Sequence, residues 1–157
     1  MKKIFTSFIV LATLSLSANA QWYLGGGTGF DFISIDGATH ATFSIAPEGG
    51  YNFNDKMSAG LAIPIIFSTR TSVSIDPYFR YKFVKFGPVS LFADAYAEFG
   101  SIASEFSWGI GAAPGLMCDI KNNWSIAGRI GNIGYNNING FNLHLINSIS
   151  VGVYKTF

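Results

Sequence analysis

Alternation of apolar and polar residues constrains how this chain can fold more than any other feature. In residues 73–83 (VSIDPYFRYKF) every second residue is apolar, and the positions between include Ser74, Asp76, Arg80 and Lys82. Successive side chains of a β-strand point to opposite faces. The pattern therefore predicts a strand with one apolar face and one polar, charged face.

The same alternation recurs in eight segments separated by short polar connections. The segments are 22–35, 41–53, 57–67, 73–84, 89–102, 106–120, 124–135 and 141–157. The connections are rich in Asn, Asp, Gly and Pro, which close hairpins, and they leave no room for crossover helices. The sequence therefore predicts one all-β domain of eight antiparallel strands in up-and-down order.

The kinds of residue on each face predict which face is outside. The apolar faces are bulky and often aromatic, whereas the opposite faces are rich in small residues such as Gly25, Gly27, Gly109 and Gly111. Charged residues make up only 12% of the chain, compared with about 25% in typical soluble domains. We therefore expect an eight-stranded transmembrane β-barrel with its apolar face toward lipid and a narrow polar lumen. A closed barrel also leaves no unpaired backbone edge in hydrocarbon. A soluble lipocalin-like binder with reversed faces is the alternative.

Two groups of residues carry further expectations about the wall. Pro47, Pro77 and Pro114 lie on the predicted outward face, and each removes a ladder donor, so we expect bulges or ladder breaks there. Aromatic residues near strand ends are expected in two girdles at the membrane interfaces. These residues are Trp22, Tyr51, Phe53, Trp124 and Phe141.

The first twenty residues have the pattern of a secretory signal peptide. Lys2 and Lys3 precede the mostly apolar residues 4–16, and Ala18 and Ala20 form an A-x-A cleavage site. We expect cleavage after Ala20, with residues 21–157 forming the barrel domain. Export does not imply disulfides here, because Cys118 is the sole cysteine.

Charged residues on the inward face predict a network that plugs the lumen. The network residues are Glu48, Asp76, Arg80, Lys82, Asp94, Glu98, Arg129 and His144, and Asp31 lies on the same face. Charges inside a narrow barrel are costly unless they are paired, and eight strands leave room only for their own side chains. We expect Glu48, Arg80, Glu98 and Arg129 at the centre, and His144 near Asp31. The alternative is a gate in a narrow pore or transport component.

Catalysis, cofactors and metal sites are not predicted. Ser148 and Ser150 share the inward face with His144, but alternate side chains on a strand lie about 6–7 Å apart, and no G-x-S-x-G sequence is present. The two histidines and Cys118 offer no metal-ligand spacing. The near balance of acidic and basic residues gives no indication of nucleic-acid binding.

Several segments together resemble a known family. They are YLGGGTGF, FSIAPEGGYNFNDKMSAGLAI, SVSIDPYFRYKF, SLFADAYAEFG, FSWGIGAAPGLMCDIKNNWSIAGRIGNIGY and FNLHLINSISVGVYKTF. These segments look like the outer-membrane β-barrel (porin-like, OmpA/OmpX-like) family common in Bacteroidetes. The resemblance implies the outer membrane of a Gram-negative bacterium, with both termini in the periplasm. It implies no catalytic activity, and the expected role is structural or surface interaction.

The resemblance also implies partners. Phe157 resembles the C-terminal signal read by the outer-membrane barrel assembly machinery, although Lys155 occupies a position that is typically apolar or aromatic. The expected partners are that machinery, periplasmic chaperones and outer-membrane lipid. We expect the barrel to be a monomer.

Overall fold

The computed structural model describes the backbone of residues 21–35, 38–68, 71–102, 105–138 and 140–157. Within these ranges it describes every side chain except those of residues 32–40, 102–105 and 144–147. The expected signal peptide, residues 1–20, lies outside the described residues. The strands are β1 Gln21–Ile35, β2 Ala38–Asn52, β3 Met57–Ala62, β4 Ile65–Phe67, β5 Ser72–Phe86, β6 Val89–Ile102, β7 Glu105–Asp119, β8 Trp124–Asn136 and β9 Gly140–Thr156. A 3-10 turn, Lys121–Asn123, precedes β8. No helix among these residues is long and apolar enough to cross a membrane.

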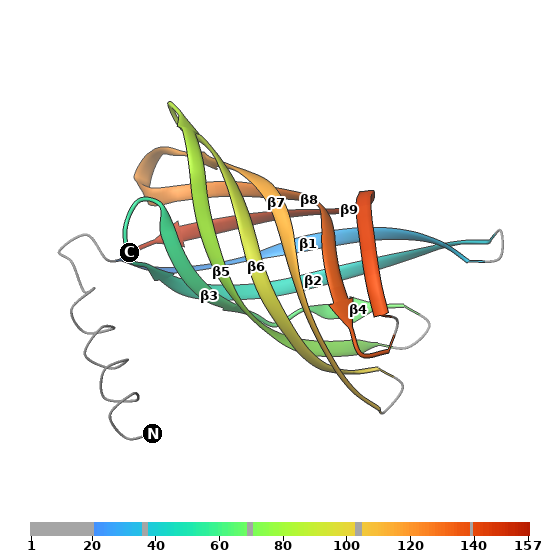
Figure 1. Ribbon diagram of the computed structural model, residues 1–157. Helices are drawn as coiled ribbons and strands as arrows, with labels where there is room; N and C mark the ends of the chain where they lie inside the picture. The colour runs from blue at the N-terminus through green and yellow to red at the C-terminus, as the bar shows by residue number, and fades with distance from the viewer. Residues whose placement is uncertain (1–20, 36–37, 69–70, 103–104, 139) are drawn as a thin grey trace, which may run out of the picture.

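The strands form a closed antiparallel barrel of eight spans (Figure 1). Each span pairs with its neighbour along the chain, and β9 closes the barrel by pairing with β1 from Tyr23↔Thr156 to Asp31↔Ser148. The β2–β3, β5–β6 and β7–β8 turns lie at the same end as the C-terminus (Figure 1). The predicted eight-stranded up-and-down barrel is confirmed, with strand limits within three residues of those expected.

The third predicted strand is interrupted at its centre, which the alternation did not indicate. Pro64 has no N–H, and β3 ends at Ala62 before β4 begins at Ile65. The register is kept across the break, because Ile63 N donates to Pro47 O at 3.0 Å and Ser74 N donates to Pro64 O at 3.1 Å. β3 and β4 therefore occupy one span of the barrel.

The three prolines expected to disturb the ladders all face outward. Pro114 lies in a register shift between β7 and β8, which confirms the expected irregularity. Pro47 faces the β3–β4 interruption, and the β5–β6 ladder has a gap at Pro77 without a change of register. Further register shifts lie between Lys82 and Val84 and between Ile130 and Asn132, where no proline is present.

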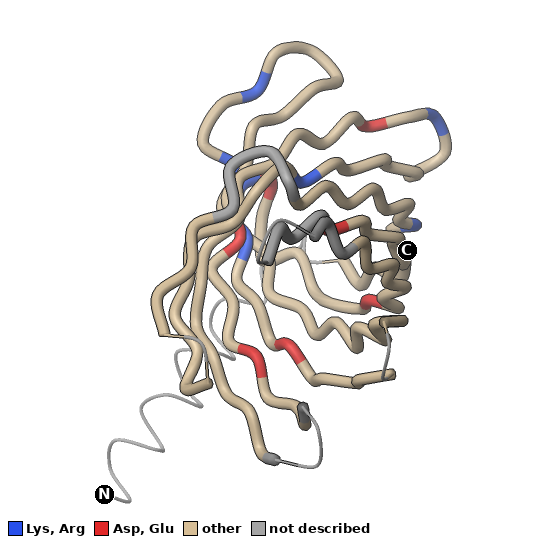
Figure 2. Tube along the Cα trace, turned by 90° about the vertical axis from the view of Figure 1, so that its right-hand side faces the viewer, with Lys and Arg blue, Asp and Glu red and all other residues tan. Residues whose placement is uncertain are grey.

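The apolar face is outside the barrel. Large apolar side chains on the wall, such as Phe79, Ile110 and Val151, are roughly half exposed, while the alternating inward positions are buried or half-buried. Figure 2 shows that charged residues are few along the trace. This orientation is the one expected for a lipid-facing barrel and the reverse of the lipocalin-like alternative.

Aromatic side chains cluster near both ends of the outer wall. Trp22 packs edge-on against Tyr51, with ring centroids 5.0 Å apart, and Tyr51 packs against Phe53, at the end that carries the C-terminus. At the other end Phe30, Phe43 and Phe67 form a row across three strands, and Trp108 packs against Tyr135. Trp124 and Phe141 are also exposed, at opposite ends of the neighbouring strands β8 and β9.

Candidate functional site

Four charged side chains from four strands meet inside the lumen. Glu48 comes from β2, Arg80 from β5, Asp94 from β6 and Arg129 from β8, each at an inward position of its strand. The side chains of Glu48, Arg80 and Asp94 are 2–4% exposed and that of Arg129 is 17% exposed. Because two are acidic and two are basic, the group is electrically balanced. We call these four residues the lumen network.

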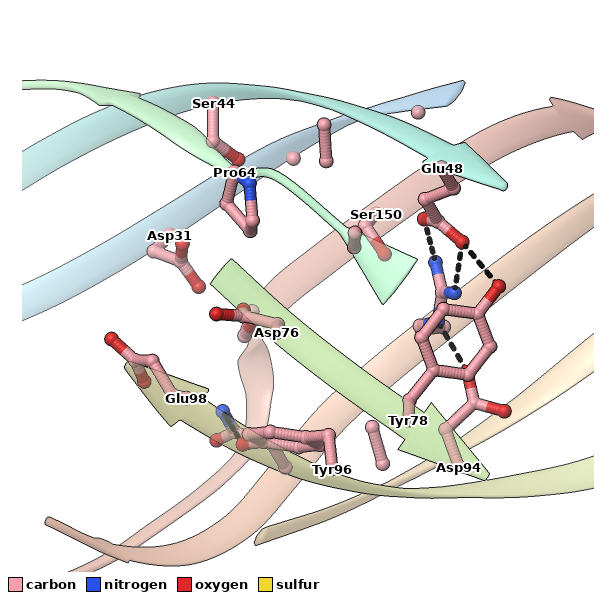
Figure 3. Close-up of a pocket in the computed structure, with 18 of the residues that line it drawn as sticks. Asp31, Ser44, Glu48, Pro64, Asp76, Tyr78, Asp94, Tyr96, Glu98 and Ser150 are labelled. Atoms are coloured by element: carbon pink, nitrogen blue, oxygen red, sulfur yellow. Dashed lines mark hydrogen bonds and ion pairs between the residues drawn. The ribbon is translucent and has the colours of Figure 1, made fainter. Parts of the chain in front are cut away.

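The lumen network is a continuous chain of ion pairs. Arg80 holds Asp94 with two parallel hydrogen bonds, Nε–Oδ1 at 2.7 Å and Nη2–Oδ2 at 2.8 Å. Arg129 Nε donates to Asp94 Oδ2 at 2.8 Å, and its Nη1 and Nη2 donate to the two oxygens of Glu48 at 3.1 and 2.9 Å. Both arginines therefore bind carboxylates in the bidentate geometry that gives the strongest charge-assisted hydrogen bonds. Figure 3 shows the bonds that join Glu48 and Asp94 to Arg129, at one side of the view.

Tyrosines complete the hydrogen bonding of Glu48. The hydroxyls of Tyr78 and Tyr154 donate to Glu48 Oε2 at 3.1 and 3.0 Å. The hydroxyls of Tyr23 and Tyr78 are 2.7 Å apart and share a further hydrogen bond. The burial of a carboxylate is tolerated only when its lone pairs are satisfied, and these contacts satisfy Glu48.

Aromatic rings pack around Arg80. Its guanidinium carbon lies 4.4 Å from the ring centroid of Phe92, which is 0% exposed, and 5.5 Å from that of Tyr154. Glycine makes room for these rings, since a Cβ at Gly25 would overlap Cδ1 of Tyr154 and a Cβ at Gly115 would overlap Cζ of Phe92. The lumen is filled at this level by paired charges and rings.

The structure corrects one member of the expected central cluster. Asp94, and not Glu98, bridges the two arginines. Arg80 lies directly opposite Asp94 in the β5–β6 ladder, whereas Glu98 lies four residues further along β6, beyond hydrogen-bonding reach of Arg80. Glu48, Arg80 and Arg129 occupy the centre, where the sequence analysis placed them.

The remaining sequence-predicted residues lie away from the network. Asp31, Asp76 and Glu98 line a cavity at the end of the barrel away from Gln21 and Phe157, and Lys82 lines a second cavity at the opposite end. The side chain of His144 lies outside the described residues, so neither its distance to Asp31 nor a Ser–His geometry is described. The sequence analysis missed Tyr23, Tyr78 and Tyr154, although alternation along β5 does place Tyr78 inward.

The lumen network separates the two cavities. The distal cavity, of about 240 Å³, lies on the side away from the termini and contains Asp31, Asp76, Tyr96, Glu98 and Asn132 in its lining. The proximal cavity, of about 340 Å³, lies beside both ends of the barrel chain and includes Lys82, Lys85, Asp55 and Asp119. Arg129 forms part of the distal lining and Arg80 part of the proximal lining. Among the described residues, no group of three or more His, Cys, Asp or Glu could hold a metal ion.

Comparison with known proteins identifies the fold. No family model matches the sequence, and no curated protein matches it. The structure is similar to the crystal structure of Neisserial surface protein A, with a TM-score of 0.64 and 18% identity over 88% of this chain and 99% of that chain.

The structure is also similar to designed barrels. The solution structure of the de novo designed TMB2.3 has a TM-score of 0.59 and 10% identity, over 89% of this chain and 97% of that chain. A second structure, from the de novo design of transmembrane β-barrels, has a TM-score of 0.51 and 10% identity, over 90% of this chain and 98% of that chain. The chain therefore has the fold of eight-stranded transmembrane barrels.

Proposed function

We propose that this chain is an integral outer-membrane barrel of a Gram-negative bacterium with a structural or surface-interaction role and a lumen closed by the lumen network. The observation that carries the proposal is the inversion of the usual arrangement of side chains. Large apolar residues cover the outside, and the buried ion pairs lie within. Such a surface needs lipid, and the exposed aromatic groups near both ends suit the two membrane interfaces.

Export and assembly belong to the same proposal. Residues 1–20 would direct export and be removed after Ala20, on the sequence pattern, and a Bacteroidetes-type outer membrane is inferred from the resemblance alone. Phe157 is exposed and its backbone N–H donates to Trp22 O at 2.9 Å. The ammonium group of Lys155 lies 5.5 Å from the centroid of the Trp124 ring. Assembly machinery, chaperones and lipid are the partners we propose, for a monomer that is not an enzyme.

Fractionation followed by gel electrophoresis tests the membrane location. We expect the protein in the outer-membrane fraction, and we expect its mobility in SDS to change on boiling, because a closed barrel stays folded in SDS until it is heated. A variant with Gly25→Pro is the matched control. Its ring would overlap the backbone of Val153 and Tyr154 in the closing β1–β9 ladder, so we expect it not to close and to show no mobility change. Recovery of the wild type in the soluble fraction without a mobility change would contradict the proposal.

A narrow pore is the second candidate, favoured by the position of the network between two cavities. The lumen network and the rings of Tyr78, Phe92 and Tyr154 lie between them, and Arg129 is the most exposed member of the network. We expect wild-type protein in planar bilayers to carry no current, and Arg129→Ala to carry discrete currents because the two cavities become connected. Lys85→Ala, which removes an exposed pair at 3.5 Å, is the control and should remain silent. A steady current through the wild-type protein would support the pore. If the wild type and both variants carry no current, side chains other than Arg129 also close the lumen.

A further inference from the structure

The end of the barrel that carries the C-terminus has an excess of positive charge. All five lysine side chains of residues 21–157 lie there, against two aspartates, Asp55 and Asp119, so the excess is three charges. The lysines are Lys56, Lys82, Lys85, Lys121 and Lys155. In Figure 2 the positions of Lys and Arg gather in the upper half of the trace, toward the turns of this end. Anionic groups are therefore attracted to this end of the barrel.

Lys155 is on the outer wall, among apolar and aromatic side chains. Its neighbour Tyr154 is 2% exposed inside the lumen, so Lys155 takes an outward position of β9. Lys155 lies opposite Trp124 of β8 and Leu24 of β1, which are 44% and 62% exposed. It forms no ion pair among the described residues. A lysine in such a place keeps its methylene groups on the apolar wall and its ammonium group at the membrane surface.

The turn between β7 and β8 adds a second ammonium group beside Lys155. Lys121 is exposed in the 3-10 turn, and Lys155 Nζ donates a hydrogen bond to the carbonyl oxygen of Asn122 in the same turn. This bond uses one of the three N–H groups of the Lys155 ammonium and leaves two for another acceptor. Ile120 and Trp124 flank the turn, and both are exposed. Two cations therefore lie next to large apolar side chains at one place on the rim.

The combination of charged and apolar groups selects the class of ligand. Ammonium groups form short, charge-assisted hydrogen bonds with phosphate oxygens. The indole ring of Trp124 has an apolar body and one N–H donor, which is the chemistry that places tryptophan at membrane interfaces. A free anion would use the ammonium groups alone. A phospholipid uses the ammonium groups through its phosphate and the apolar side chains through its acyl chains.

We infer that Lys121, Lys155 and Trp124 form a binding site for the phosphate headgroup of an anionic phospholipid. The inference rests on the proposed membrane location, which puts this part of the rim at the surface of the leaflet on the C-terminal side. Near an anionic membrane each lysine strengthens binding by about fivefold, so two lysines are enough to enrich anionic lipid over zwitterionic lipid here. An apolar residue at position 155, which the C-terminal signal typically has, would not supply this charge.

Quenching of Trp124 fluorescence by brominated lipids measures the lipid composition next to the site. The variant Trp22→Phe/Trp108→Phe keeps Trp124 as its one tryptophan and serves as the reference protein. It is reconstituted in vesicles of phosphatidylcholine and phosphatidylglycerol, with bromine on the acyl chains of one lipid or the other. We expect phosphatidylglycerol to bind beside Trp124 with an association constant about threefold or more above that of phosphatidylcholine. The preference should fall as salt is raised from about 50 to about 500 mM, because salt screens the attraction.

The double variant Lys121→Gln/Lys155→Gln, made in the reference protein, should bring the two association constants to within about 1.5-fold of each other. The matched control is Lys56→Gln/Lys82→Gln, which removes the same charge at the same end, from the β2–β3 turn and from β5. The control should keep the preference within about twofold of the reference, because its charges lie on other strands of the rim. The mobility change on boiling shows that each variant is folded. If the double variant does not fold, Lys121→Gln in the exposed turn is measured by the same criteria.

Three results would overturn the inference. Equal association constants of the two lipids in the reference protein would show no preference at Trp124. Equal losses in the two double variants would show attraction by the overall charge without a site. A preference that inorganic phosphate abolishes, at an ionic strength where chloride does not, would show a site for free phosphate. In each case quenching by phosphatidylcholine would still place Trp124 against lipid, whereas no quenching by either lipid would contradict the proposed membrane location as well.

Discussion

Arg80→Ala is expected to lower the free energy of unfolding of the barrel by about 3–5 kcal/mol, because it leaves Asp94 buried without its bidentate partner. The side chain of Arg80 is 2% exposed, and its Nε–Oδ1 bond to Asp94, at 2.7 Å, is the shortest in the network. Its removal also leaves a void beside the buried ring of Phe92. Urea unfolding in detergent, followed by the fraction that keeps its unboiled mobility, measures the change.

The control for Arg80→Ala is Lys85→Ala. Lys85 also pairs with an aspartate, but at 3.5 Å and with its side chain 62% exposed, so its removal should cost less than about 1 kcal/mol. A second variant, Arg80→Met/Asp94→Leu, removes both charges while Arg129 keeps its two bonds to Glu48. We expect this double variant to be more stable than Arg80→Ala, since no uncompensated charge remains. A loss under 1 kcal/mol for Arg80→Ala would show that the network does not stabilise the barrel.

The fold could be predicted because every span obeys the same rule. Period-2 alternation determines which side chains share a face of a strand, and short polar connections make consecutive strands antiparallel neighbours. The number of strands, their order and the outward direction of the apolar face can therefore be derived from short stretches of sequence. The alternation gives no signal of the interruption at Pro64, which lies within the apolar run of residues 61–67. The missing N–H that led us to expect irregularities at Pro47, Pro77 and Pro114 is the physical cause at Pro64 as well, although none was expected there.

The centre of the site depended on register, which the alternation does not determine. Asp94 and Glu98 are both inward on β6, so sequence alone cannot choose between them as the partner of Arg80. The β5–β6 hairpin begins with Phe86 opposite Val89, and continuing that register would place Arg80 opposite the outward Ala95. The one-residue shift between Lys82 and Val84 brings Arg80 opposite Asp94 instead. Such a shift changes which side chains face each other along the whole strand.

Buried tyrosines were missed for a different reason. Their rings make them candidates for the interface girdles, and Tyr154 is near the C-terminal signal. In the structure Tyr154 is 2% exposed and hydrogen-bonded to Glu48. A buried carboxylate needs several donors. That requirement, applied to Glu48, is the signal in the sequence that points to inward tyrosines on other strands.

Val151→Arg is expected to lower the free energy of unfolding by about 2–4 kcal/mol in lipid, the cost of an arginine on the lipid face near the bilayer midplane. Val151 is outward and half exposed, and it pairs with Thr28, the central residue of β1, and with Gly128. Unfolding in urea from lipid vesicles measures the loss. The same substitution on a strand surface in contact with water would change stability by less than about 0.5 kcal/mol.

Phe86→Arg separates the effect of lipid from a general intolerance of arginine on the wall. Phe86 is the last residue of β5 and is 68% exposed, so an arginine there can reach the headgroups, and we expect a loss of about 1 kcal/mol or less. The lipid-facing assignment requires the central substitution to cost more than the terminal one. Equal and small losses at both positions would mean that the outer face contacts water. The apolar wall would then have to be covered by something other than a bilayer.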